Sequence, residues 1–273
     1  MKKTDLFNIS GKVIVVTGGA GALGGNMASY LLTQGAKIVI LDLFPESVTK
    51  RVGELKDIGA DVFGIAGSVL DQEHLEKAKN EILEKWGQID VLINAAGGNM
   101  PGATIGVDQT IFDLKMDDFK KVSELNLNGS VLPSMVFGEV MANQRSGSII
   151  NISSMTATQA VTRVVGYSAS KAAIDIFTKW MATEMAIKFE GSVRVNAIAP
   201  GFFIGNQNRA LLTNEDGSYT DRGNTIIDNT PMKRFGDADE LNGAIHWLMS
   251  DAASFVTGTI VPIDGGFSAF SGV

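Results

Sequence analysis

Three residues have the types and the spacing to carry out acid-base chemistry. Tyr167 and Lys171 stand four residues apart, thirteen and seventeen residues beyond Ser154. If that segment is helical, the phenol and the ammonium share one face. A phenol titrates near pH ~10, and a neighbouring cation favours phenolate, which would lower the pKa of Tyr167 and let it exchange a proton at neutral pH. Ser154 would offer a second hydroxyl to a substrate oxygen.

A glycine-rich turn near the N-terminus predicts a dinucleotide site. An apolar β-branched strand over 12–17 runs into Gly19-x-Gly21-x-x-Gly24, and a helical pattern follows. Such a turn lets backbone amides approach a pyrophosphate at the positive end of a helix dipole. The alternative interpretation is a glycine-rich turn that binds nothing. The Tyr-x-x-x-Lys spacing is a weak signal by itself, and it becomes informative because the same chain also contains this glycine-rich turn.

The residue that ends the second strand selects the cofactor. The strand over 37–42 ends at Asp42, whose carboxylate can accept hydrogen bonds from the adenosine ribose. The same carboxylate would repel a 2′-phosphate, and no arginine follows it directly. The sequence therefore predicts NAD rather than NADP.

Composition narrows the class of protein. The chain has 273 residues, 45% of them hydrophobic, enough for one full core. The absence of cysteine excludes disulfides and thiol chemistry, and we expect no bound metal. A net charge of −7 argues against nucleic acid and against an anionic membrane surface. No apolar run approaches a membrane helix and no signal sequence is apparent, so we expect a cytoplasmic protein with a small-molecule substrate.

Strands and helices alternate along the chain. This pattern predicts an α/β fold, a single-domain Rossmann-type doubly wound parallel sheet of about seven strands with helices on both faces, spanning residues 1–273. The ligand should bind outside the carboxyl ends of the strands. The later strands are expected at 61–66, 89–93, 147–152, 193–199 and 259–263, and the later helices at 46–58, 71–86, 117–143, 166–189 and 237–250.

Two long segments interrupt the alternation. Residues 96–114 form a polar, glycine-containing excursion, and residues 202–231 form a longer one. Loops of this length in a compact α/β domain are usually lids or binding loops. We therefore interpret 202–231 as a substrate-binding lid, with a surface insertion as the alternative. His74 and His246 fall in helical patterns and are expected on the outside in structural roles.

Taken together, the motifs resemble the short-chain dehydrogenase/reductase family over essentially the whole chain. The residues that carry the resemblance are Thr17-Gly18…Leu23-Gly24, Asn94-Ala95-Ala96-Gly97, Asn126-Leu127-Asn128-Gly129, Ile152-Ser153-Ser154, Tyr167…Lys171 and Pro200-Gly201.

The resemblance implies roles for particular residues. It implies a catalytic set of Asn126, Ser154, Tyr167 and Lys171, in which Tyr167 exchanges the proton, Ser154 holds the substrate oxygen, Lys171 binds the nicotinamide ribose and Asn126 positions a water. It also implies a cofactor site made of Gly18, Ala20, Leu23, Gly24, Asp42, Ser68, Val69, Asn94, Ala95, Ala96, Gly97, Tyr167, Lys171, Pro200, Gly201 and Ile204. Three positions depart from the family pattern: Ala22 replaces a glycine, Ser68 an aspartate and Gly205 a threonine.

Several loops further resemble the D-mannonate oxidoreductase, or fructuronate reductase, subgroup. They are residues 94–104, residues 200–214 and the tail 264–273. This resemblance implies hydride transfer between NAD(H) and a sugar acid, with D-fructuronate and D-mannonate as the pair. A sugar acid needs a cation for its carboxylate and polar partners for its hydroxyls. The candidate substrate residues are Asn99, Ser154, Thr156, Arg163, Phe202, Gln207 and Arg209.

Alternatives to this substrate stay open at the level of sequence. A gluconate or polyol dehydrogenase would use the same chemistry on a related substrate. A 3-oxoacyl-thioester reductase shares the catalytic set, although its acidic carrier protein would need a basic docking patch. A non-catalytic NAD-binding protein is the third alternative. The resemblance also suggests a homotetramer, with the helices 117–143 and 166–189 pairing across one interface.

Overall fold

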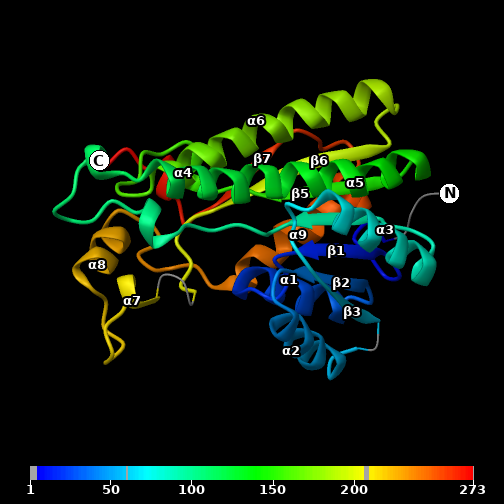
Figure 1. The fold of residues 1–273 in the computed structure, drawn as a ribbon, viewed down its shortest axis with the longest axis horizontal. Coiled ribbons are helices and arrows are strands. Elements are labelled where there is room, and N and C mark those ends of the chain that lie inside the picture. The colour runs from blue at the N-terminus through cyan, green and yellow to red at the C-terminus, as the bar shows by residue number, and fades with distance from the viewer. Residues whose placement is uncertain (1–4, 60, 206–208, 273) are drawn as a thin grey trace.

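A single parallel sheet forms the centre of the molecule. The computed structural model describes residues 5–59, 61–205 and 209–272. In this part of the chain the sheet has seven strands in the order β3-β2-β1-β4-β5-β6-β7, and each neighbouring pair is parallel (Figure 1). The strands are β1 Val13–Thr17, β2 Lys37–Asp42, β3 Val62–Ala66, β4 Val91–Asn94, β5 Gly147–Ile152, β6 Val193–Pro200 and β7 Ile260–Ile263.

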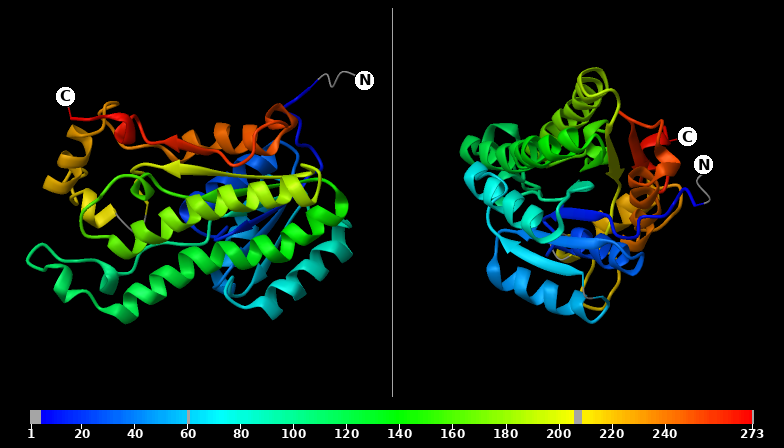
Figure 2. Two further views of the ribbon diagram at one scale, coloured as in Figure 1. Left: turned by 90° about the horizontal axis from the view of Figure 1, so that it is seen from above. Right: turned by 90° about the vertical axis from the view of Figure 1, so that its right-hand side faces the viewer.

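Helices cover both faces of this sheet (Figure 2). One face packs against α1 (Ala22–Thr33), α2 (Pro45–Lys56) and α9 (Asn242–Met249). The other face packs against α3 (Gln72–Trp86), α5 (Gly129–Gln144) and α6 (Val165–Lys188). The predicted doubly wound fold with helices on both faces is therefore confirmed.

The first strand shows how sequence alternation builds the two layers of core. Successive side chains of a strand point to opposite faces of a sheet. Ile14 and Val16 of β1 lie in the core on the α1 side, whereas Val13 and Val15 lie in the core on the α3 side. A strand that is buried on both faces must be apolar at every position, which explains the unbroken run Val-Ile-Val-Val.

The strand order places the functional motifs beside one another. Strand β1 pairs with β2 on one side and with β4 on the other, so the chain reverses its direction of winding at β1. In doubly wound sheets, ligands bind at such a reversal, outside the carboxyl ends of the strands. The glycine-rich turn after β1, Asp42 at the end of β2 and Asn94 at the end of β4 meet at this point.

The helix expected over 117–143 is built from three pieces. It consists of α4 (Met116–Ser123), a π-helical segment (Glu124–Asn128) and α5. A π-helical turn is rare and occurs mostly at functional sites. The spacing of apolar residues does not reveal this π-helical segment, because one additional residue in a turn shifts that spacing only locally.

The segment 202–231 contains regular structure that the sequence did not predict. Two short helices lie within it, α7 (Arg209–Leu212) and α8 (Asp221–Asp228), at the same end of the molecule as the C-terminal tail (Figure 1). The predicted helix 237–250 begins as a 3₁₀ turn (Ala238–Leu241) before α9. No helix in the described part of the chain is long and apolar enough to cross a membrane.

The expectation that His246 lies on the outside is wrong. Its side chain is buried, because α9 packs against α1 and the N-terminal segment. The Nδ1 atom of His246 lies 2.9 Å from the Tyr30 hydroxyl, and Nε2 lies 2.6 Å from the Phe7 carbonyl oxygen. Both ring nitrogens therefore have partners, and this histidine joins three segments of the chain.

Candidate active site

Three residues with catalytic chemistry converge where β5 ends and α6 begins. Ser154 follows β5 closely, and Tyr167 and Lys171 lie one turn apart in α6. The Tyr167 phenol is hydrogen-bonded to the side chain of Ser154. Lys171 Nζ lies 5.3 Å from the centroid of the Tyr167 ring. The structure thus brings together the hydroxyl, the phenol and the ammonium that the sequence spacing places on neighbouring elements.

Lys171 is held deep in the protein. Its side chain is only 4% exposed, and Nζ donates a 2.7 Å hydrogen bond to the carbonyl oxygen of Ile152 at the end of β5. Burial lowers the pKa of Lys171 from its usual 10.5 to about 8, and the carboxylate of Asp175, one turn further along α6, opposes that decrease. Asp175 in turn accepts a 2.5 Å hydrogen bond from the hydroxyl of Ser153.

The Tyr167 pKa differs from the sequence-based expectation. Burial raises it above the usual value, and the hydrogen bond from Ser154 lowers it only in part. The expected decrease caused by the Lys171 ammonium is therefore wrong for the protein alone, because removing a phenolate from water outweighs the favourable hydrogen bond. With its proton retained at neutral pH, Tyr167 is suited to donate it to a substrate oxygen.

Asn126 lies buried in the π-helical segment and holds the loop that follows β4. Its Nδ2 donates to the carbonyl oxygens of Gly98 (2.7 Å) and Val122 (2.8 Å), and its Oδ1 accepts from the Gly98 amide (3.1 Å). A Cβ atom on Gly97 would approach Asn126 Oδ1 to 2.6 Å and Lys171 Nζ to 3.6 Å. Asn126 therefore places the backbone of the β4 loop beside Lys171.

The glycine-rich turn has the shape that a pyrophosphate requires. Gly18 has φ +63°, and a Cβ there would lie 2.7 Å from the Ala95 carbonyl oxygen. A Cβ on Gly24 would lie 2.5 Å from the Gly18 carbonyl oxygen. Helix α1 begins after Gly21 without a side-chain cap and without an acidic residue in its first turn. Its first amides are thus available to an anion.

Asp42 lies against this turn. Its Oδ2 accepts a 3.0 Å hydrogen bond from the Ala20 amide, and its Oδ1 accepts a 2.7 Å hydrogen bond from the Leu43 amide. Nη2 of Arg51, from α2, lies 3.5 Å from the Ala20 carbonyl oxygen. The carboxylate therefore lies against the turn beside which the sequence predicts the adenosine ribose, and the Arg51 guanidinium contacts the same residue of that turn.

The residues after β4 are fixed by buried hydrogen bonds. The Thr17 hydroxyl accepts from the amides of Ala95 and Ala96, at 3.1 Å each. The Asn94 side chain points into the protein, where Nδ2 donates to Ser134 Oγ and Asn151 Oδ1, at 2.8 Å each. The Asn94 side chain is therefore occupied inside the protein, and it fixes the end of β4 against α5 and β5. Thr17 was not in the predicted cofactor set, although its place before the glycine turn was a usable signal.

The other predicted cofactor residues lie around the same end of the sheet. Ser68 Oγ accepts from the Leu70 amide (3.1 Å), and Val69 is buried against Gly129 at the start of α5. Gly201 follows β6, and a Cβ there would lie 2.7 Å from the Cα atom of Asp264. Ile204 packs on a small apolar cluster formed by Leu212, Ile226 and Phe235. Leu23 and Pro200 occupy the start of α1 and the end of β6.

The predicted substrate residues differ in burial and in hydrogen bonding. Asn99 and Thr156 each keep one buried polar atom, Oδ1 and Oγ1, without a hydrogen-bond partner in the described protein. Arg163 has φ +80° and donates from Nε to the Ile105 carbonyl oxygen (2.8 Å). Arg209 is exposed at the start of α7. Gln207 lies outside the described residues.

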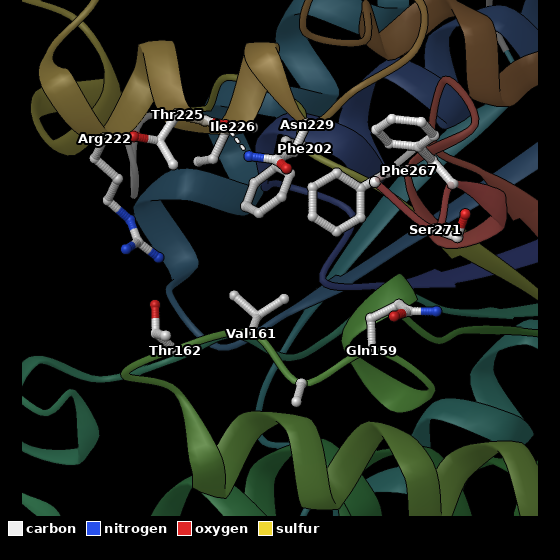
Figure 3. A pocket seen from close by; sticks show the side chains of 13 residues that line it. Gln159, Val161, Thr162, Phe202, Arg222, Thr225, Ile226, Asn229, Phe267 and Ser271 are labelled. Carbon is white, nitrogen blue, oxygen red and sulfur yellow. Dashed lines mark hydrogen bonds between the residues drawn. The ribbon is translucent and has the colours of Figure 1, made fainter.

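A cavity of about 330 Å³ has one of the predicted substrate residues, Phe202, in its lining (Figure 3). One wall is the loop that joins Ser154 to Tyr167, and the opposite wall is α8. Neither Ser154 nor Tyr167 lines it, so the cavity lies against their connecting loop and does not contain the two hydroxyls. Its walls are formed by Gln159, Ala160, Val161, Thr162, Phe202, Arg222, Thr225, Ile226, Asn229, Phe267, Phe270, Ser271 and Gly272.

Arg222 is the charged residue of this cavity, and it was not among the predicted substrate residues. A signal was present: Arg222, Thr225, Ile226 and Asn229 recur at helical spacing, so all four share one face of α8. The sequence pattern could not say which of the arginines in the segment 202–231 faces the interior. That depends on how α8 packs.

Comparisons with known proteins place the chain among oxidoreductases. A family model described as enoyl-(acyl carrier protein) reductase matches residues 18–268. An uncharacterized oxidoreductase of Bacillus subtilis, UxuB, is 45% identical and covers 97% of this chain and 98% of its own. The 5-keto-D-gluconate 5-reductase of Escherichia coli is 32% identical over 96% of this chain and 97% of its own.

One solved structure is similar over the whole chain. It is a Haemophilus influenzae protein provisionally assigned as a D-mannonate oxidoreductase, crystallised with bound NAD. It is 41% identical and superposes with a TM-score of 0.88 over 97% of this chain and 98% of its own.

Proposed function

The chain belongs to the short-chain dehydrogenase/reductase family, and on that premise we propose that it transfers a hydride between NAD(H) and a sugar acid, with D-fructuronate and D-mannonate as the pair. The observation that carries the chemistry is the hydrogen bond between Tyr167 and Ser154, with Lys171 Nζ 5.3 Å from the ring centroid of Tyr167. The provisional assignment of the Haemophilus influenzae protein supports the substrate.

NAD fits the residues that the chain offers it. The turn leaves no room for a side chain at Gly18, Gly19 or Gly24, and the uncapped start of α1 suits a pyrophosphate. Asp42 would accept hydrogen bonds from the adenosine ribose, and the backbone from Ala95 to Gly97 would border the nucleoside. When bound, NADH supplies the hydride, and NAD⁺ accepts it.

The protein's own residues would handle the proton and the substrate oxygen. In the direction of reduction, the Tyr167 hydroxyl donates its proton to the developing alkoxide, and the Ser154 hydroxyl stabilises that oxygen by a hydrogen bond. Lys171, fixed by the Ile152 carbonyl, presents a positive charge that favours the resulting phenolate. Asn126 keeps the loop after β4 in place beside Lys171.

The segment 202–231 would act as the lid of the site. Its first residues follow Pro200-Gly201 at the end of β6, and Phe202 contacts Phe267 of the C-terminal tail with ring centroids 5.4 Å apart. Its helix α8 forms one wall of the cavity. Closure of such a segment over bound substrate excludes water from the reacting atoms.

We also propose a homotetramer. Met135 on α5 and Ile176 and Trp180 on α6 are 57%, 64% and 62% exposed in the single chain. Ile174 and Met181, on the other side of α6, are buried in the core. The apolar surface that remains outside would be covered by pairing these helices with those of a second copy.

A panel of carbonyl compounds tests the reaction. Purified protein is mixed with NADH and D-fructuronate, D-tagaturonate, 5-keto-D-gluconate or an acetoacetyl thioester, and the decrease in NADH absorbance is followed. The highest kcat/KM is expected for D-fructuronate. A higher value for 5-keto-D-gluconate would instead favour the substrate in the name of the Escherichia coli relative. Turnover of the thioester alone would favour an acyl reductase, and bound NADH with no turnover would favour a non-catalytic role.

A further inference from the structure

Arg222 occupies a wall of the cavity beside the candidate active site. It lies in the first turn of α8, and its side chain extends from that helix across the cavity toward Thr162 on the opposite wall (Figure 3). Thr162 belongs to the loop between Ser154 and Tyr167. A ligand bound at this guanidinium would therefore lie between the lid segment and the loop that joins Ser154 to Tyr167.

The guanidinium of Arg222 has no protein partner in the described part of the chain. It is half-buried and forms no hydrogen bond or ion pair there. The exposed residues Arg145 and Arg234 and the half-buried Arg51 differ from it, because each is paired with a glutamate, at 2.9, 2.6 and 2.8 Å respectively. A half-buried cation without a counter-charge is costly unless a ligand supplies one.

A second arginine increases the positive charge at the same place. Arg163 follows Thr162 directly, and it is close enough to Arg222 to lower the pKa of that residue, in addition to the larger effect of burial. Arg163 is anchored through its Nε to the Ile105 carbonyl oxygen. Two guanidinium groups placed near each other repel, and a bound anion would remove that repulsion.

The remaining walls suit a polyhydroxylated carbon chain. Gln159, Thr162 and Asn229 supply amide and hydroxyl groups, while Phe202 and Ile226 supply apolar surface. The Gln159 side chain donates to the Ser268 carbonyl oxygen (3.0 Å), which joins this wall to the C-terminal tail. A few polar groups converging on a partly apolar cavity are typical of small-molecule sites.

We propose that Arg222 binds the carboxylate of the sugar-acid substrate, supported by Arg163, and so holds α8 over the bound substrate. This inference rests on the proposed function and assigns the residue that selects an acid over a neutral sugar. Carboxylate binding by Arg222 would also couple substrate recognition to closure of the segment 202–231, because a single ligand would contact both walls.

Kinetics of Arg222→Gln, compared with Arg209→Gln, test the proposal. Arg209 belongs to the same segment but is exposed and outside the cavity. With D-mannonate and NAD⁺, Arg222→Gln is expected to raise KM about 10- to 100-fold, the effect of losing hydrogen bonds to a charged group, with little change in kcat. The KM of Arg222→Lys should lie between those of the wild type and Arg222→Gln, since lysine keeps the charge but loses the planar guanidinium. Arg209→Gln, which removes the other candidate cation of this segment, should raise KM less than Arg222→Gln does, and an equal or larger increase would move the carboxylate to Arg209.

Binding of a matched neutral ligand separates recognition from damage to the fold. D-mannonamide keeps the carbon chain of D-mannonate and replaces its carboxylate by an amide. Calorimetry on the NADH complex, in which D-mannonate cannot be oxidised, should show that the preference for D-mannonate over D-mannonamide is lost in Arg222→Gln, while the NADH dissociation constant is unchanged. Equal affinity of wild type and Arg222→Gln for D-mannonate would overturn the Arg222 assignment alone. Failure of the wild type to turn over any sugar acid would overturn the proposed function instead.

Discussion

Lys171 Nζ lies 5.3 Å from the centroid of the Tyr167 ring and at the same time donates a 2.7 Å hydrogen bond to the carbonyl oxygen of Ile152. The second contact fixes the position of the first, because it ties α6 to the end of β5. Ser153, the residue after Ile152, makes a parallel tie by donating to Asp175 one turn beyond Lys171. The two contacts set the distance between Ser154 on one element and Tyr167 on the other.

Removal of the phenol hydroxyl should separate chemistry from binding. Tyr167→Phe is expected to lower kcat about 10³-fold or more, because the developing alkoxide loses its proton donor. The NADH dissociation constant, measured by fluorescence titration, should change little. Ser154→Ala should be impaired to a smaller degree, since it removes one hydrogen bond to the same oxygen. Turnover by Tyr167→Phe within tenfold of the wild type would contradict the proton-donor role.

Asp175 should control the pH dependence of reduction through Lys171. The pKa of Lys171 is lowered to about 8 by burial, and Asp175 raises it. The value of kcat/KM for reduction should therefore fall as the pH rises through about 8, where Lys171 loses its charge. Asp175→Asn removes the opposing carboxylate and should move this decrease in kcat/KM to lower pH. Asp175→Glu keeps the carboxylate and should show the pH dependence of the wild type. An unchanged profile in Asp175→Asn would show that Lys171 does not limit the reaction.

The same lowered pKa predicts a stability cost at Lys171. Below pH 8 the lysine is charged in both folded and unfolded chains, and the penalty of burying the charge is fully present. Between pH 8 and 10.5 the folded chain loses its proton first, so the penalty decreases as the pH rises. Lys171→Met should therefore increase the free energy of unfolding by about 1–2 kcal/mol at pH 7, after the lost hydrogen bond is subtracted. Urea denaturation should show that this difference in the free energy of unfolding decreases toward pH 10. The variant should be inactive at every pH.

The sequence was most informative where one residue type is required by local geometry. Gly18 is required because a side chain there would meet the Ala95 carbonyl oxygen. Asp42 is at the end of a strand, and this position brings its carboxylate to the glycine-rich turn. Tyr167 and Lys171 were recognisable because a spacing of four residues has a fixed meaning in a helix.

The sequence was less informative where tertiary packing decides. The burial of His246 depends on the N-terminal segment, which lies 239 residues away in the chain. The place of Arg222 in the cavity wall depends on how α8 packs, and the raised pKa of Tyr167 depends on burial from several elements. The helical spacing around Arg222 predicts which side chains share a face of α8 but not what that face contacts, and the other two features have no signature within their own stretches of sequence.

Asp42 and Arg51 together should determine the choice between NAD and NADP. The Asp42 carboxylate accepts from the Ala20 amide, and Arg51 Nη2 lies 3.5 Å from the Ala20 carbonyl oxygen. Asp42→Ala should weaken NAD binding about tenfold and narrow the preference over NADP, because the repulsion of a 2′-phosphate is removed. The double variant Asp42→Ala/Arg51→Ala should lose the gain for NADP, since no nearby cation then meets the phosphate. Dissociation constants for both cofactors measure the effect, and an unchanged preference in Asp42→Ala would refute the assignment.

Asn126 should support the site through the loop after β4. Its side chain makes hydrogen bonds to both the amide and the carbonyl of Gly98, and Gly97 lies between Asn126 and Lys171. Asn126→Ala leaves these backbone groups without their partner, so it is expected to destabilise the fold by about 1–3 kcal/mol and to lower kcat. Asn128, exposed in the same π-helical segment, provides the matched control. Because Asn128→Ala keeps the buried contacts, it should retain near wild-type activity and stability. Equal losses in the two variants would mean that the π-helical segment as a whole matters rather than the contacts of Asn126.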